Sequence, residues 1–170
     1  MRNLNIRLSL PFRFLLFGSL SRFERLVGMN SNMAHGDGHF VFIDCDQVDG
    51  VELLWSLKEL QGKYDLGEIF ITSDDKVNSY RVWCFKVVPF RTLMRIISEF
   101  PYTDIDFIRW TARKGHATMR LTPKEGRAEQ EVVGRVEGRK NPMPQQVSIV
   151  EYETPRGKSV RLGYEVMADG

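Results

Sequence analysis

The stretch FVFIDCD, residues 40–46, constrains the fold most, because an apolar run typical of a buried β-strand ends in two carboxylates. Side chains alternate between the two faces of a strand, so Asp44 and Asp46 share one face, opposite Ile43 and Cys45. Two neighbouring carboxylates repel each other unless a cation or a basic side chain neutralises them. The pair therefore indicates either a divalent-metal site on a sheet surface or an acidic strand end that runs into a turn.

The patterns after this strand predict an α+β domain. Apolar residues at spacings of three and four predict two amphipathic helices, at residues 50–64, with Asp49 as N-cap, and at 89–100. Short runs rich in β-branched and aromatic residues predict four more strands. These runs are residues 68–75, 79–88, 104–110 and 116–122. The order strand, helix, strand, strand, helix, strand, with one strand more, is that of the split βαβ, or ferredoxin-like, plan.

This plan places the first strand in the middle of the sheet, between the third and the fourth, with both helices on one face. The third strand carries Ser and Arg at alternate positions, and the fourth carries two Asp in the same way. If the registers agree, six polar side chains lie together on the face that the helices leave open. They are Asp44, Asp46, Ser79, Arg81, Asp104 and Asp106.

Such a face has the groups that phosphoryl transfer needs. Three carboxylates on adjacent strands can hold two Mg²⁺ or Mn²⁺ ions about 4 Å apart, which align an attacking hydroxyl with a triphosphate. Cations beside the metals neutralise the phosphate oxygens, and Arg81, Arg120 and Lys124 are candidates, with His116 a weaker one. Taken singly, each of these basic residues is more often an ordinary solvated surface charge.

In this order the motifs resemble those of the archaeo-eukaryotic primase superfamily. FIDCD stands at the hhhDxD motif of that family, SYR at its S-x-H motif, and IDF at its h-D motif, followed by MRLTPK. The resemblance covers residues 40–124 and implies an RRM-like catalytic core. It departs from the family at Arg81, which replaces the motif's histidine. Arginine still grips phosphate but does not give up a proton at neutral pH.

The resemblance implies a primase-polymerase-like nucleotidyltransferase that acts in DNA replication, either as a minimal catalytic module of a plasmid or virus or as a subunit. Its metal ligands and catalytic residues would be Asp44, Asp46 and Asp106, with Mg²⁺ or Mn²⁺ as cofactor. Its nucleotide-binding residues would be Ser79, Arg81, Arg120 and Lys124, to which the residue pattern adds His116. Expected partners are nucleoside triphosphates, a single-stranded DNA template, and a helicase or another replication subunit.

Other functions are compatible with the same predicted sheet. A non-catalytic RRM-like module would bind single-stranded nucleic acid by stacking bases on Phe42, Tyr80 and Trp110, although acids on that face repel phosphates unless metals intervene. A primase relic would keep the fold without the activity. A ferredoxin-like assembly domain would instead present an apolar sheet face.

The rest of the chain is expected to flank this core. Residues 1–39 form a basic and apolar segment that packs on the core, with an amphipathic helix near residues 15–27. Residues 125–170 contain a charged loop or short helix, up to residue 140, and a β-hairpin that turns at residues 155–158. The net charge of +2 excludes a strongly basic nucleic-acid coat, and no window is apolar enough for a membrane span. Two cysteines in apolar runs favour a reducing, cytoplasmic location.

Overall fold

The computed structural model describes residues 5–9, 15–19, 23–33, 37–74, 76–123, 127–141 and 147–155. The chain divides into two units, one of residues 27–151 and one of residues 1–26 and 152–170. In the smaller unit, β1 (Asn5–Ser9) and β2 (Leu15–Ser19) form a two-stranded antiparallel sheet. The prediction of a helix near residues 15–27 is therefore wrong. Gly18 in this stretch disfavours a helix, and the aromatic residues Phe17 and Phe23 suit strands.

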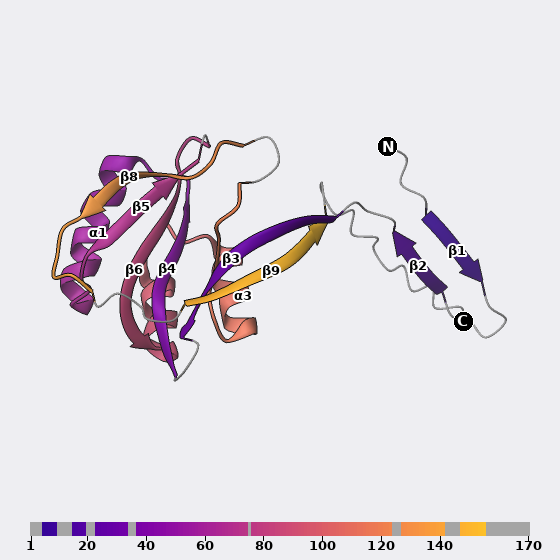
Figure 1. Cartoon of the computed structure of the whole chain (residues 1–170), viewed down its shortest axis with the longest axis horizontal. Coiled ribbons are helices and arrows are strands. Elements are labelled where there is room, and N and C mark those ends of the chain that lie inside the picture. The colour runs from indigo at the N-terminus through magenta and orange to yellow at the C-terminus, as the bar shows by residue number, and fades with distance from the viewer. Residues whose placement is uncertain are drawn as a thin grey trace, which may run out of the picture. The chain divides into compact units, whose positions relative to one another are not determined.

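The larger unit is built on a seven-stranded antiparallel sheet, which confirms the α+β class (Figure 1). The strand order is β7-β3-β4-β6-β5-β8, and β9 pairs with β3. The strands are β3 (Phe23–Met33), β4 (Gly38–Asp46), β5 (Ile69–Ser73), β6 (Ser79–Pro89), β7 (Thr118–Arg120), β8 (Glu131–Val136) and β9 (Val147–Pro155). The helices are α1 (Gly50–Tyr64), α2 (Phe90–Glu99) and α3 (Ile105–Lys114).

The arrangement is compatible with a ferredoxin-like plan but departs from the predicted one at the fourth strand. The central strand β4 lies between β6 and β3, and β7 pairs with β3 instead of directly with β4. The stretch DIDFIRW forms most of helix α3, so the strand predicted there is wrong. Asp104 Oδ1 accepts hydrogen bonds from the backbone N–H groups of Asp106 and Phe107, and Gly115 ends the helix in a left-handed conformation. These two caps favour a helix over the alternation that suggested a strand.

The C-terminal third also differs from the prediction. Residues 131–136 form strand β8, which pairs with β5, where a charged loop or short helix was expected. The β-branched residues of EVVGRV suit a strand better than a helix. Residues 147–155 form strand β9, which pairs with β3, and the rest of the expected C-terminal hairpin, residues 156–170, lies outside the described residues.

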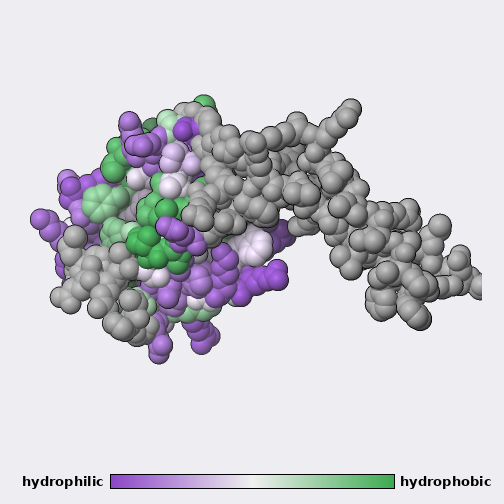
Figure 2. Space-filling model, turned by 45° about the vertical axis from the view of Figure 1, so that its right-hand side comes forward, coloured by the Kyte–Doolittle hydropathy of each residue, from purple (hydrophilic) through white to green (hydrophobic). Residues whose placement is uncertain are grey.

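The hydrophobic core lies between the sheet and helices α1 and α2. Asp49 begins α1 as predicted, because its carboxylate accepts a hydrogen bond from the Val51 N–H at 2.9 Å. The helices contribute fully buried leucine and isoleucine side chains. The sheet contributes the apolar side chains on the face opposite to that of Asp44. The fully buried leucine and isoleucine side chains of helices and sheet include Ile43, Leu53, Leu57, Ile69, Leu93, Ile96 and Ile97. Where residues are coloured in Figure 2, the surface is mostly hydrophilic, with a patch of apolar side chains near the middle of the coloured part.

A close backbone contact after α1 gives a first prediction. A Cβ added at Gly67 would lie 2.5 Å from the carbonyl oxygen of Arg139, on a segment held by the Glu68 N–H bond to that oxygen. Gly67→Ala is therefore expected to lower the free energy of unfolding by about 1–3 kcal/mol, measured by urea denaturation.

Gly62 provides the matched control, because a Cβ there meets nothing within 4 Å inside α1. Gly62→Ala is expected to raise the free energy of unfolding by up to about 1 kcal/mol, since alanine favours the helix. Equal stability of Gly67→Ala and the wild type would contradict the close contact.

Candidate functional site

The pairing of β4 with β6 brings four predicted polar residues together. Asp44 lies directly opposite Arg81, and Asp46 lies opposite Ser79. Opposed residues in antiparallel strands project from the same face of the sheet. The structure therefore places these four side chains side by side, as the alternation in both strands predicts.

Asp44 is the buried acid of the site. Burial raises the pKa of its carboxyl group, and the negative charges of Asp46 and Asp104 act in the same direction. Arg81 and Arg120 lower that pKa, but their effect is the smaller one. An ionised Asp44 is thus held at an energetic cost that an additional cation would relieve.

Asp46 is more exposed and already neutralised. Its Oδ1 lies 2.6 Å from the Lys76 ammonium nitrogen. Burial acts to raise the pKa of Asp46, but hydrogen bonds from Lys76 and Ser79 outweigh it, so the pKa lies below its ordinary value. The pKa values of these two acids on one strand are therefore shifted in opposite directions, upward for Asp44 and downward for Asp46.

Arg81 is held by a second acid that the sequence analysis did not single out. Its guanidinium lies 3.6 Å from Asp74 Oδ2, and Arg127 lies 3.3 Å from the same oxygen. The Asp74 side chain is only 5% exposed and also accepts a hydrogen bond from the Lys76 N–H. Asp74 follows strand β5 in a turn, so no local pattern sets it apart from its acidic neighbours.

Arg120, predicted to bind phosphate, lies at the end of strand β7. Its charge acts on both Asp44 and Arg81, which places it at the same cluster. Its Nε atom is buried and lacks a hydrogen-bond partner within the part of the chain that the structure describes. We define the charged cluster as Asp44, Asp46, Asp74, Lys76, Ser79, Arg81, Arg120 and Arg127.

The structure does not bring Asp106 to this cluster. It lies in the first turn of α3, where its side chain is 72% exposed and pairs with Arg109 at 3.1 Å. Asp104 is closer, because its N–H donates to the Asp44 carbonyl at 2.8 Å and its charge raises the pKa of Asp44. The Asp104 carboxylate, however, caps helix α3.

The two remaining predicted residues do not add to the cluster. His116 precedes β7 and lies near His39, where burial and the charge of Lys114 lower its pKa. Lys124 lies outside the described residues.

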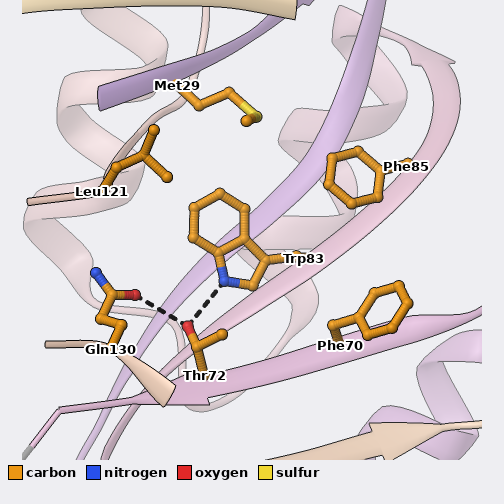
Figure 3. Close-up of a pocket in the computed structure, with 7 residues that line it drawn as sticks. All are labelled: Met29, Phe70, Thr72, Trp83, Phe85, Leu121 and Gln130. Atoms are coloured by element: carbon orange, nitrogen blue, oxygen red, sulfur yellow. Dashed lines mark hydrogen bonds between the residues drawn. The ribbon is translucent and has the colours of Figure 1, made fainter. Parts of the chain in front are cut away.

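A hollow of about 330 Å³ adjoins the charged cluster (Figure 3). Trp83 stands at its centre, between the apolar side chains of β5, β6 and β3 and the segment that follows β7. The residues that line it are Met29, Phe70, Thr72, Trp83, Phe85, Leu121 and Gln130. No sequence pattern indicates this hollow, because its walls come from segments far apart in the chain.

The three aromatic residues proposed to stack on bases do not form one surface. Phe42 is fully buried against Trp83, with ring centroids 5.1 Å apart. Tyr80 pairs with Cys45 on the opposite face, where its hydroxyl approaches Gly50 of helix α1. Trp110 is exposed on α3 beneath Arg113 and Lys114.

The side chains available as metal ligands limit which kind of metal site this cluster can form. Within the described residues, no three or more His, Cys, Asp or Glu side chains are arranged to hold a metal ion. The paired carboxylates Asp44 and Asp46 still suit Mg²⁺, which commonly binds one or two carboxylates while waters and substrate phosphates complete its shell. The residues thus fit a metal that binds together with a triphosphate rather than a closed cage of acids.

Comparisons with protein-family models, with curated proteins and with solved structures found no match to this chain. The primase resemblance therefore rests on the motifs themselves. Among the helices described here, none has the length and apolar character needed to cross a membrane.

Proposed function

We propose that this chain is a metal-dependent nucleotidyltransferase of the primase-polymerase type, which adds nucleotides from nucleoside triphosphates to a DNA strand on a single-stranded template. The observation that carries the proposal is the register of β4 and β6, which sets Asp44 against Arg81 and Asp46 against Ser79. Two acids of the kind that bind Mg²⁺ and an arginine of the kind that binds phosphate are thereby adjacent on one sheet face, which supports phosphoryl transfer.

The acids and the arginines of the cluster have different roles in this proposal. Asp44 and Asp46 would hold Mg²⁺ or Mn²⁺, which when bound neutralises phosphate charge and activates the attacking hydroxyl. Arg81 and Arg120 bind the oxygens of the triphosphate, where negative charge develops during transfer. Ser79 donates a hydrogen bond to its neighbour Asp46 and keeps that carboxylate in place.

Asp74 and Arg127 act behind these groups. Asp74 fixes the guanidinium of Arg81 through a buried ion pair, so the forked donor is oriented before the nucleotide binds. This preorganisation suits an arginine at the position where the primase motif has a histidine. A helicase or another replication subunit would supply the unwound template in a plasmid or virus replication system.

Primer extension tests this function directly. The full-length protein is expected to extend a labelled primer on a single-stranded template with dNTPs or NTPs in the presence of Mg²⁺ or Mn²⁺. Removal of the metal with EDTA is expected to stop extension, because without the cation the acidic Asp44 and Asp46 repel the triphosphate. Extension that continues in EDTA, or no extension with any metal and nucleotide set, would refute the proposal.

A further inference from the structure

We propose that the hollow around Trp83 binds the nucleobase of the nucleoside triphosphate and does so with little discrimination among bases. This inference rests on the proposed function, because it assumes that the neighbouring charged cluster binds the triphosphate. It adds a base subsite that none of the sequence motifs indicates.

The hollow and the charged cluster share a boundary. Thr72 lines the hollow and lies directly opposite Arg81 in the sheet. Trp83 is two residues beyond Arg81 on the same face of β6, about 7 Å along the strand. Leu121, on the other wall, follows Arg120 in the chain. A ligand that fits both places therefore has an anionic part joined to an apolar part, as a nucleotide has.

The walls of the hollow suit a flat aromatic ring. Phe70, Trp83 and Phe85 provide aromatic surfaces, and Met29 and Leu121 provide flexible apolar ones. A volume of about 330 Å³ lies within the range of small-molecule sites. Nucleobases stack on aromatic side chains whatever their sequence, because every base has a π-face.

The polar groups of the hollow are already paired with one another (Figure 3). The Trp83 indole N–H donates to Thr72 Oγ1 at 2.9 Å, and the Thr72 hydroxyl donates to Gln130 Oε1 at 3.0 Å. Gln130 Nε2 in turn donates to the Arg120 carbonyl oxygen at 2.9 Å. Because these polar groups are already hydrogen-bonded, stacking is expected to contribute more to the affinity for a base than hydrogen bonds to the base edges. Similar affinity for all bases follows, which suits an enzyme whose choice of base comes from the template.

Fluorescence of Trp83 tests the proposal. The chain has three tryptophans, so Trp55→Phe with Trp110→Phe leaves Trp83 as the only one, and both replaced residues are exposed. With Mg²⁺ present, ATP, GTP, CTP and UTP are expected to quench this fluorescence and to bind within about threefold of one another. The affinity for each nucleotide is expected to be at least about tenfold higher than that for inorganic tripolyphosphate, which has no base.

Filling the hollow gives a second test, measured by calorimetry. Leu121 is 38% exposed, so Leu121→Trp adds a ring at the rim without disturbing the core. It is expected to weaken ATP binding about tenfold and to leave tripolyphosphate binding unchanged. The control Val51→Trp, on the exposed side of α1, is expected to change neither.

The outcomes separate this inference from the proposed function. Equal affinity for ATP and tripolyphosphate, or normal ATP binding by Leu121→Trp, would overturn the base subsite even where primer extension succeeds. The four nucleotides could bind at Trp83 more tightly than tripolyphosphate in a protein that never extends a primer. That result would support the base subsite and overturn only the polymerase proposal.

Discussion

Asp44→Asn is expected to abolish metal-dependent nucleotide incorporation and, at neutral pH, to raise the free energy of unfolding. Asparagine has the shape of the carboxyl group but lacks the charge that a metal ion needs, so incorporation is expected to fall at least about a hundredfold. Burial and the charges of Asp46 and Asp104 disfavour the ionised carboxylate in the folded protein. Removing that charge is expected to stabilise the protein by about 0.5–2 kcal/mol.

The stabilisation has a defined pH dependence. The pKa of Asp44 is raised above the ordinary value of 3.8, so the folded protein retains a proton that the unfolded chain has already lost. The cost of ionising Asp44 is therefore complete above the raised pKa and absent below 3.8. The gain from Asp44→Asn should be largest near about pH 8 and should vanish in acid, as measured by urea denaturation across this range.

Asp106→Asn is the matched control for the loss of activity. Asp106 is exposed on α3 and pairs with Arg109, away from the charged cluster. Incorporation is expected to continue in this variant. A severe loss of incorporation in Asp106→Asn would show that α3 rearranges to bring a third acid to Asp44. A wild-type or lower stability of Asp44→Asn near about pH 8 would contradict the buried, unfavourable charge.

The elements with a strong periodic pattern were predictable from the sequence. Helices α1 and α2, the hairpin of β5 and β6, and the facing of Asp44 toward Arg81 all follow from spacing and alternation. DIDFIRW was not predictable in this way, because its alternation is also compatible with a helix whose first turn is capped by Asp104. Local capping decided between the two structures there.

The unpredicted parts of the site depend on contacts between distant segments. Asp74 is one acid in a polar turn, and only the three-dimensional structure shows that its side chain is buried between Arg81 and Arg127. Leu121 and Met29 reach the hollow from segments that are far from Trp83 in sequence. Periodicity describes which face a residue occupies, but it contains no information about which loop covers that face.

Asp74→Asn is expected to destabilise the protein, in contrast to the same chemical change at Asp44. Its carboxylate is nearly inaccessible and neutralises two guanidinium groups, those of Arg81 and Arg127. Removing one partner of a buried ion pair leaves uncompensated charge, so the free energy of unfolding is expected to fall by about 2–4 kcal/mol. Asp65→Asn, at an exposed pair with Lys86, is the control and should have a much smaller effect.

The pH dependence of this variant has the opposite sign to that of Asp44→Asn. Burial acts to raise the pKa of Asp74, but hydrogen bonds from Lys76 and Arg127 and the charge of Arg81 outweigh it, so the pKa is lowered. The stability that Asp74 contributes is present above the ordinary value of 3.8 and is lost as the pH falls through the lower folded value. Urea denaturation should thus show the wild type and Asp74→Asn converging in acid. A loss of stability at neutral pH in both variants would contradict the unfavourable charge at Asp44 and would mean that both carboxylates stabilise the fold by neutralising Arg81.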